Sequence, residues 1–264
     1  MSFDIKNAVT RASLKDTYNR SGHALDGCPF AVLQEISSLA GYHYYVNDFV
    51  TYEGPIADGA TKLGGWVVTS VDGGADTAEE VVVQDSSQFG VLKITTNDAD
   101  DDNTQIQLAG SSFRYVVGKR LWCFARLAIE DADDGEMGFG LVKEDATDMV
   151  NTAPTDGIYF EKAETATTLD FHTRKNDVDS ETAGASGTLS DATYIIVGFK
   201  VNTDGSVSAY SGTTLDNLAL EATVVAGSTS LPDDEDLTLA FQVQTGSAAT
   251  RYMLIDWVFV AQER

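Results

Sequence analysis

From residue 45 onward, short apolar and β-branched runs alternate with clusters of Asp, Asn and Gly. Such runs are typical of β-strands, and about a dozen can be recognised. Helical patterns of about 10–15 residues between the runs, which would indicate a parallel sheet, are not found. The pattern predicts an all-β fold, an antiparallel two-sheet jelly-roll sandwich. The predicted strands are Trp66–Val71, Glu80–Gln84, Phe89–Thr95, Thr104–Leu108, Arg120–Ile129, Met137–Val142, Gly157–Glu161, Thr168–Thr173, Tyr194–Val201, Ser206–Tyr210, Leu237–Gln244 and Tyr252–Val260.

Two Asp-Gly pairs mark predicted turns between neighbouring strands. Asp204-Gly205 separates two strand runs by so few residues that it predicts a tight hairpin, since glycine readily supplies the positive φ of the turn. Asp134-Gly135 predicts a second turn, between Arg120–Ile129 and Met137–Val142.

Residues 1–44 follow a different pattern and are expected to form a short helical N-terminal arm, with the sandwich spanning residues 45–264. Ile5, Ala8, Val9 and Ala12 are spaced as one apolar stripe of a helix. A second helix is predicted to begin at Pro29 and to end at Gly41. Because isolated helices this short are marginal in water, they must dock on this chain's own core or on a neighbouring subunit.

The arm therefore supplies the candidate partner-binding residues, together with three tyrosines at its junction with the sandwich. Tyrosine is enriched at protein contacts. The alternative is that these tyrosines pack on their own domain. The candidate residues are Ile5, Val9, Ala12, Phe30, Leu33, Ile36, Tyr42, Tyr44 and Tyr45.

Charge separates the same two parts of the chain. The protein has 17 Lys and Arg against 41 Asp and Glu, a net charge of −24. Four basic and four acidic residues balance within residues 1–44, so the sandwich carries the whole excess. A surface this acidic repels phosphate groups, which argues against nucleic-acid and membrane-surface binding. No run approaches the ~20 apolar residues of a membrane span.

The two cysteines, Cys28 and Cys123, are too few for a disulfide framework. The N-terminus has no apolar signal region, so synthesis in a reducing cytoplasm is expected.

One acidic loop is a weak candidate for calcium. Asp98, Asp100 and Asp102 alternate as the ligands of a calcium loop do, but Ala109 stands where an EF-hand requires its closing glutamate. The alternative is a solvated acidic turn between two strands. No other metal or cofactor site is predicted.

A second acidic stretch contains Asp131, Asp133 and Glu136 and superficially resembles the paired acids of sandwich-fold glycosidases. The predicted Asp134-Gly135 turn would place Asp131 and Glu136 on different strands rather than on one face. No catalytic residues are therefore assigned, and a non-enzymatic protein is expected. Trp66, Trp122 and Trp257 lie within strand runs, which favours core packing over a sugar-binding platform.

Several segments resemble virion structural proteins of tailed bacteriophages, especially marine and cyanobacterial phages. They are Gly157–Lys162, Tyr194–Val201 with its Asp204-Gly205 turn, Tyr252–Val260, and the ending Gln262-Glu263-Arg264. Asn47-Asp48-Phe49, followed by Trp66, is similar to the first strand of such a sandwich. These proteins have a concanavalin-A-like jelly roll and include capsid decoration, or cement, proteins.

The resemblance covers residues 45–264 and implies a structural protein of the outer capsid surface, made in the cytoplasm of the bacterial host. Its expected partners are the major capsid protein and further copies of itself, in a homo-oligomer such as a trimer. A receptor- or carbohydrate-binding tail protein of the same fold is the alternative. A glycan hydrolase is a third and weaker one.

Overall fold

The computed structural model describes residues 41–49, 56–57, 61–63, 65–71, 80–83, 90–145, 148–150 and 152–264. The candidate partner-binding residues Ile5, Val9, Ala12, Phe30, Leu33 and Ile36 lie outside these ranges, as does Cys28. Among the described residues, no helix is long and apolar enough to cross a membrane.

The described chain folds as strands joined by turns, with one short 3-10 helix, η2, at Leu215–Asn217. The strands are β1 (Tyr42–Asn47), β2 (Ile56–Ala57), β3 (Thr61–Leu63), β4 (Trp66–Val71), β5 (Glu80–Val83), β6 (Leu92–Thr95), β7 (Asn103–Leu108), β8 (Leu121–Ile129), β9 (Gly135–Lys143), β10 (Gly157–Lys162), β11 (Asp170–Lys175), β12 (Val178–Thr182), β13 (Ile195–Val201), β14 (Val207–Gly212), β15 (Ala219–Val224), β16 (Leu237–Thr245) and β17 (Tyr252–Glu263).

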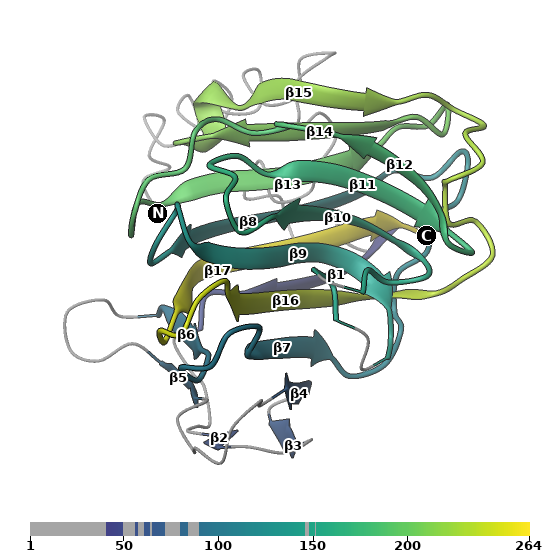
Figure 1. The fold of residues 1–264 in the computed structure, drawn as a ribbon. Helices are drawn as coiled ribbons and strands as arrows, with labels where there is room; N and C mark the ends of the chain where they lie inside the picture. The colour runs from purple at the N-terminus through teal and green to yellow at the C-terminus, as the bar shows by residue number, and fades with distance from the viewer. Residues whose placement is uncertain are drawn as a thin grey trace, which may run out of the picture.

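These strands form two antiparallel sheets that lie face to face, as Figure 1 shows. Sheet A has the order β15-β14-β13-β8-β17-β6-β5-β2, and β1 also pairs with β17. Sheet B has the order β12-β11-β10-β9-β16-β7-β4-β3. The all-β jelly-roll sandwich predicted from the strand pattern is confirmed.

The main core lies between the sheets and is built from alternate residues of each strand. On β9, Met137, Phe139 and Leu141 face this core. Phe139 stacks on Phe241 of β16, with the ring centroids 5.0 Å apart. The residues between them point to the outer side of sheet B, because side chains alternate along a strand.

Sheet A carries a second apolar layer on its outer side. Trp122 and Phe124 of β8 and Phe259 of β17 are buried there, with Tyr42 and Leu215 packed against them. The inward-facing residues of β8, such as Cys123, are buried in the main core. This burial on both faces explains why β8 is an almost unbroken apolar run rather than an alternating one.

The strand predictions agree with the structure, except near the start of the sandwich and at two further strands. β1 begins at Tyr42 and ends at Asn47, so Asp48 and Phe49 follow the first strand rather than form it. Phe49 has a positive φ of 52° and its N–H donates to Asn47 Oδ1 at 2.8 Å, which closes a turn. β12 was not predicted because most of its side chains are polar and exposed, and β15 was not predicted because it has only two buried side chains, Ala222 and Val224.

The Asp204-Gly205 hairpin is confirmed. Gly205 has φ +89° and its N–H donates to the Asn202 carbonyl oxygen at 2.9 Å. The Asp134-Gly135 pair also lies where β8 turns into β9.

A substitution at Gly198 tests how closely β13 packs against β8 in the apolar layer outside sheet A. A methyl group at this position would overlap the Phe124 ring and the Cys123 carbonyl oxygen, both on the neighbouring strand β8. We expect Gly198→Ala to lower the free energy of unfolding by about 1–3 kcal/mol, measured by urea denaturation. Gly187→Ala is the control, because a methyl group there meets no atom within 4 Å. Equal stability of the two variants would contradict the close packing of β8 against β13.

Candidate functional site

The outer side of sheet B is polar, in contrast to the outer side of sheet A. Glu136 on β9, Glu161 on β10, His172 on β11, and Gln242 and Gln244 on β16 alternate with core-facing neighbours. All but Glu161 are buried, so their polar atoms must find partners on the surface of the sheet. We call this surface the outer B face.

A cluster of acidic groups surrounds one histidine at the β12 side of this face. His172 Nδ1 lies 3.1 Å from Asp179 Oδ2, and its Nε2 lies 3.7 Å from Glu161 Oε2. Glu181 lies directly across from His172 in the β11–β12 ladder. The ligand atoms of His172, Asp179 and Glu181 all lie within 4.8 Å of one another. We call Glu161, His172, Asp179 and Glu181 the histidine cluster.

Electrostatics at the histidine cluster are dominated by negative charge. Burial raises the pKa of Glu161 to about 8, and the charges of Asp170, Asp179, Glu136 and Glu181 add to the rise. Burial, together with the Glu161 charge, also raises the pKa of Tyr159, whose ring stacks on His172 at a centroid distance of 5.0 Å. Positive charge is therefore favoured in this part of the face.

Glu136 is a second buried carboxyl on the outer B face. Burial raises its pKa to about 7, and nearby Asp101, Glu164 and Asp148 raise it further, while Lys162 opposes them. Such a carboxyl can hold or release a proton near neutral pH. The outward positions that follow it on β9 are Gly138 and Gly140, so β9 supplies no second carboxyl.

The loop between β9 and β10 covers the middle of the outer B face. The Met149 N–H donates to Gln242 Oε1 at 2.6 Å, and Gln242 Nε2 donates to Asp148 Oδ1. The Met149 side chain lies over Gly138 and forms a buried apolar cluster with Val142, Tyr159 and Ala240. A polysaccharide bound across this part of the face could reach Glu136 only if the β9–β10 loop moved.

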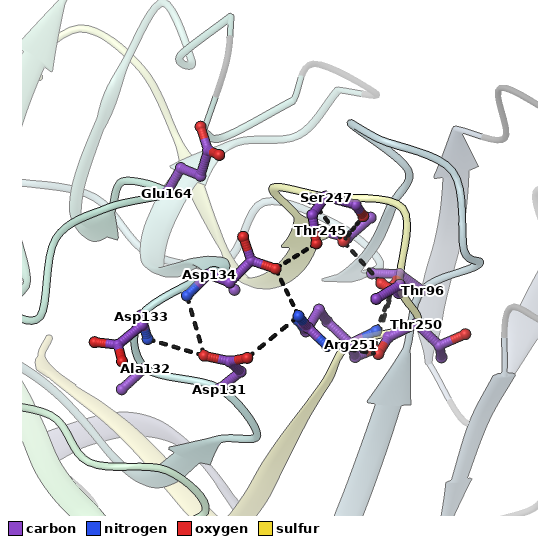
Figure 2. A network of polar contacts seen from close by, with 12 residues as sticks. Thr96, Asp131, Ala132, Asp133, Asp134, Glu164, Thr245, Ser247, Thr250 and Arg251 are labelled. Atoms are coloured by element: carbon purple, nitrogen blue, oxygen red, sulfur yellow. Dashed lines mark hydrogen bonds and ion pairs between the residues drawn. The ribbon is translucent and has the colours of Figure 1, made fainter.

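The acidic turn between β8 and β9 is held together by Arg251, as Figure 2 shows. One guanidinium nitrogen lies 3.2 Å from Asp131 and 2.5 Å from Asp134. Asp131 Oδ1 also accepts the N–H groups of Asp133 and Asp134 at 3.0 and 3.1 Å. The Asp131 and Asp134 carboxylates thus stabilise the turn. Glu136 lies on β9, whereas Asp131 precedes that strand in the turn, so the two acids do not share one strand, as the Asp134-Gly135 turn predicts.

The calcium candidate loop lies between β6 and β7. Asp98 and Asp100 are exposed, whereas Asp102 is buried and its Oδ2 accepts the Ala99 N–H at 2.9 Å. In the described part of the chain, the histidine cluster brings three ligand atoms of different residues within 4.8 Å, and this aspartate set is not found to do so. Calcium binding by Asp98, Asp100 and Asp102 stays a prediction.

The three junction tyrosines lie on β1. Tyr42 packs on Trp122, with ring centroids 6.1 Å apart, and Tyr45 meets the Trp66 ring edge-on at 5.8 Å. Two of the three tyrosines therefore pack on their own domain, while Tyr44 is half exposed. Trp66 and Trp122 are buried as predicted from their strand runs.

Trp257 differs from the other tryptophans because it borders a groove on the outer side of sheet A. This groove has a volume of about 160 Å³ and a mostly apolar lining. Its lining residues come from three distant segments, so no local sequence pattern could have revealed it. They are Val46, Asn47, Asp48, Leu215, Trp257, Val258 and Phe259. We call it the β1 groove.

Sequence reasoning also missed the histidine cluster. Asp170 and His172 on β11, and Asp179 and Glu181 on β12, are each separated by one residue. Polar residues at such spacing share one face of a strand, and this was the available signal. The pairing of β10, β11 and β12 that unites them could not be deduced from spacing alone.

Comparisons with known proteins establish the fold class. No protein-family model matches the chain, and no curated protein matches it. Among solved structures, it is similar to an endo-1,3-beta-glucanase from Streptomyces sioyaensis, with 13% identity, a TM-score of 0.55, and 85% of this chain and 97% of that chain covered.

Two further structures are similar over most of the chain. Lectin II from Ulex europaeus has 11% identity and a TM-score of 0.54, with 83% of this chain and 98% of that chain covered. A protein of unknown function from Shewanella oneidensis MR-1 has 14% identity and a TM-score of 0.54, with 84% and 87% covered. At these identities the similarity concerns the fold, which is a lectin-like, concanavalin-like jelly roll.

The raised pKa of Glu136 predicts how stability changes with pH. A carboxyl with a higher pKa in the folded state stabilises the fold below pH 4.5, and this contribution is lost as the pH rises through about 7. The shift corresponds to at most about 3 kcal/mol. We expect Glu136→Gln to be more stable than the wild-type protein at pH 8 but not at pH 4, in urea denaturation.

Glu144→Gln is the control for this comparison, because Glu144 is an exposed glutamate close to the end of the same strand. The control should follow the wild-type pH dependence. The same pH dependence in Glu136→Gln as in the wild-type protein would contradict the assignment.

Proposed function

We propose that this protein is a non-enzymatic structural component of a tailed-phage virion that decorates the capsid by binding the lattice of the major capsid protein. The resemblance of residues 45–264 to virion structural proteins motivates the proposal. The β1 groove is the observation that carries it. The protein self-associates as a homo-oligomer on the outer surface of the shell.

The β1 groove suits a protein partner because of its position and chemistry. It is an apolar surface on a chain with a net charge of −24, so contact there buries apolar area without bringing acidic surfaces together. Val46 is 51% exposed at its edge, and Tyr44 on the same strand is 48% exposed. Apolar residues exposed together mark interaction surfaces more often than isolated ones do.

The groove also lies where the N-terminal arm joins the sandwich. Its first lining residues belong to β1 and the turn after it, and β1 follows residues 1–40 directly. The arm has apolar stripes and no net charge in its sequence, so its chemistry, like that of the groove, suits contact with a protein partner. A decorating protein needs such contact surfaces on the side that meets the shell.

The outer B face supports a non-catalytic role. A glycosidase needs two carboxyl groups about 5–9.5 Å apart that face an open substrate site. Here the loop carrying Met149 lies over Gly138, next to Glu136, and Asp131 is bound to Arg251. Both features argue against a catalytic pair formed by Glu136 and Asp131.

A charge placed in the β1 groove tests the docking surface. We expect Val46→Glu to weaken binding to the capsid at least tenfold, because docking would bury an unpaired carboxylate. Binding is measured by co-sedimentation with shells of the encoding phage that lack the decoration protein. Val178→Glu is the matched control: Val178 is 48% exposed but lies on β12, in the other sheet.

Wild-type protein that does not bind the shells would overturn the proposed function. Shell binding by the wild-type protein that Val46→Glu leaves unchanged would instead overturn the role of the β1 groove.

The absence of hydrolase activity is a separate prediction. We expect no release of reducing ends from β-1,3-glucan or other polysaccharides during prolonged incubation at pH 5 to 8. The measurement is a reducing-sugar assay of wild-type protein and Glu136→Gln side by side. Turnover that disappears in Glu136→Gln would establish an enzyme.

Carbohydrate binding is the second candidate function, and the amide groups on the outer B face favour it. Gln105 and Gln107 of β7 lie beside Gln242 and Ala240 of β16, and within the described part of the chain Gln105 Nε2 has no hydrogen-bond partner. Amide groups on a sheet surface can bind sugar hydroxyls. A glycan array separates the two candidates, since glycan binding without shell binding would favour a receptor- or carbohydrate-binding tail protein.

A further inference from the structure

We propose that His172, Asp179 and Glu181, with Glu161 beside them, form a binding site for a divalent transition-metal ion of the zinc type. The site would connect β10, β11 and β12 at the β12 side of the outer B face. It is independent of the proposed capsid function and of the calcium candidate loop.

Geometry is the first argument for this site. Ligand atoms about 2.0–2.2 Å from a shared ion lie within about 4.4 Å of one another. Those of His172, Asp179 and Glu181 already lie within 4.8 Å. His172 and Glu181 are direct ladder partners, and Asp179 is two residues from Glu181 on the same side of β12. Small side-chain rotations are therefore enough to close the site.

The donor set selects the class of ion. An imidazole nitrogen with carboxylate oxygens suits zinc and its neighbours among the transition metals, whereas calcium prefers six to eight oxygen ligands. His172 is almost fully buried, which fixes its ring, while Asp179 and Glu181 are exposed and leave an entry path from solvent.

Tyr159 provides a second, independent observation. Its side chain is fully buried and its ring stacks on His172 with an interplanar angle of 11°. Among the described residues its hydroxyl group makes no hydrogen bond of normal geometry, although the Arg174 side chain lies near it and an unpaired buried hydroxyl is destabilising. Tyr159 and Glu161 are two residues apart on β10, so both side chains lie on the outer B face beside His172. A water molecule bound to the ion would supply the missing partner.

Charge balance points the same way. Asp170 adds a fourth carboxyl group, directly across from Glu161 in the β10–β11 ladder. Arg174 on β11 lies 3.4 Å from Asp177 at the β11–β12 turn, and its charge also acts on Tyr159. A divalent cation would offset the repulsion among the carboxylates, whereas a protonated His172 brings only a single charge.

Titration of the full chain with zinc chloride tests the site. We expect one equivalent to bind in isothermal titration calorimetry, with a rise in melting temperature. Glu181→Gln should weaken this binding at least tenfold, and it should fold because Glu181 is exposed. Glu144→Gln is the matched control, and His43→Asn is the histidine control, because His43 stacks on Phe113 in another part of the fold.

A spectroscopic measurement identifies the ligand directly. In nitrogen-15 spectra of the imidazole groups, zinc should shift the signal of one histidine, and His172→Asn should remove that signal. Two results would overturn the proposal: no binding of zinc, or binding that Glu181→Gln and His172→Asn leave unchanged. Zinc binding that moves no imidazole signal would also overturn it, since the ion would then sit on surface carboxylates.

Discussion

The apolar character of β8 on both faces is the constraint on which the arrangement of the molecule depends. Cys123, Ala125 and Leu127 fill the space between the sheets, while Trp122 and Phe124 point outward. A sheet with an apolar outer side must be covered, because exposed aromatic surface is costly in water. β1, the η2 segment and β17 provide that cover around Trp122 and Phe124, and the β1 groove lies at its edge.

The outer side of sheet B is polar rather than apolar. It carries polar groups that the β9–β10 loop and the acidic turns partly bury, so each of these groups needs a partner. Gln242 illustrates the solution, since it accepts from the Met149 backbone and donates to Asp148. Among the residues that the structure describes, Tyr159 Oη, Gln105 Nε2 and Arg174 Nε make no hydrogen bond of normal geometry, and all three lie on strands of sheet B. The outer side of sheet A thus makes apolar contacts, whereas the outer side of sheet B carries the polar and ionisable groups.

Burial of charge links these polar groups to pH and to cations. Glu136 and Glu161 lie on adjacent strands of sheet B. Burial raises the free-energy cost of ionising each of these carboxyl groups. Lys162 lies on the core side of β10 and donates to the carbonyl oxygens of Ala163 and Glu164 at 3.1 and 3.3 Å, which holds the end of β10 in place. Arg251 does the same for the turn that precedes β9. The Lys162 and Arg251 side chains thus stabilise turns rather than neutralise the histidine cluster. The carboxyl groups of that cluster therefore outnumber the positive charges beside them.

The sequence by itself determined the fold class, most strands and the hairpin at Gly205, because apolar alternation and turn chemistry are local properties. It also placed Trp66, Trp122 and Cys123 in buried positions, since exposing a long apolar run to water is unfavourable. Only the tertiary structure decided that Glu136 is buried, and that Tyr42 and Tyr45 pack inward. It alone brought His172 to Asp179 and Glu181, and Val46 to Trp257. Each of these contacts depends on strand pairing and register between distant segments, which residue spacing within one segment does not specify.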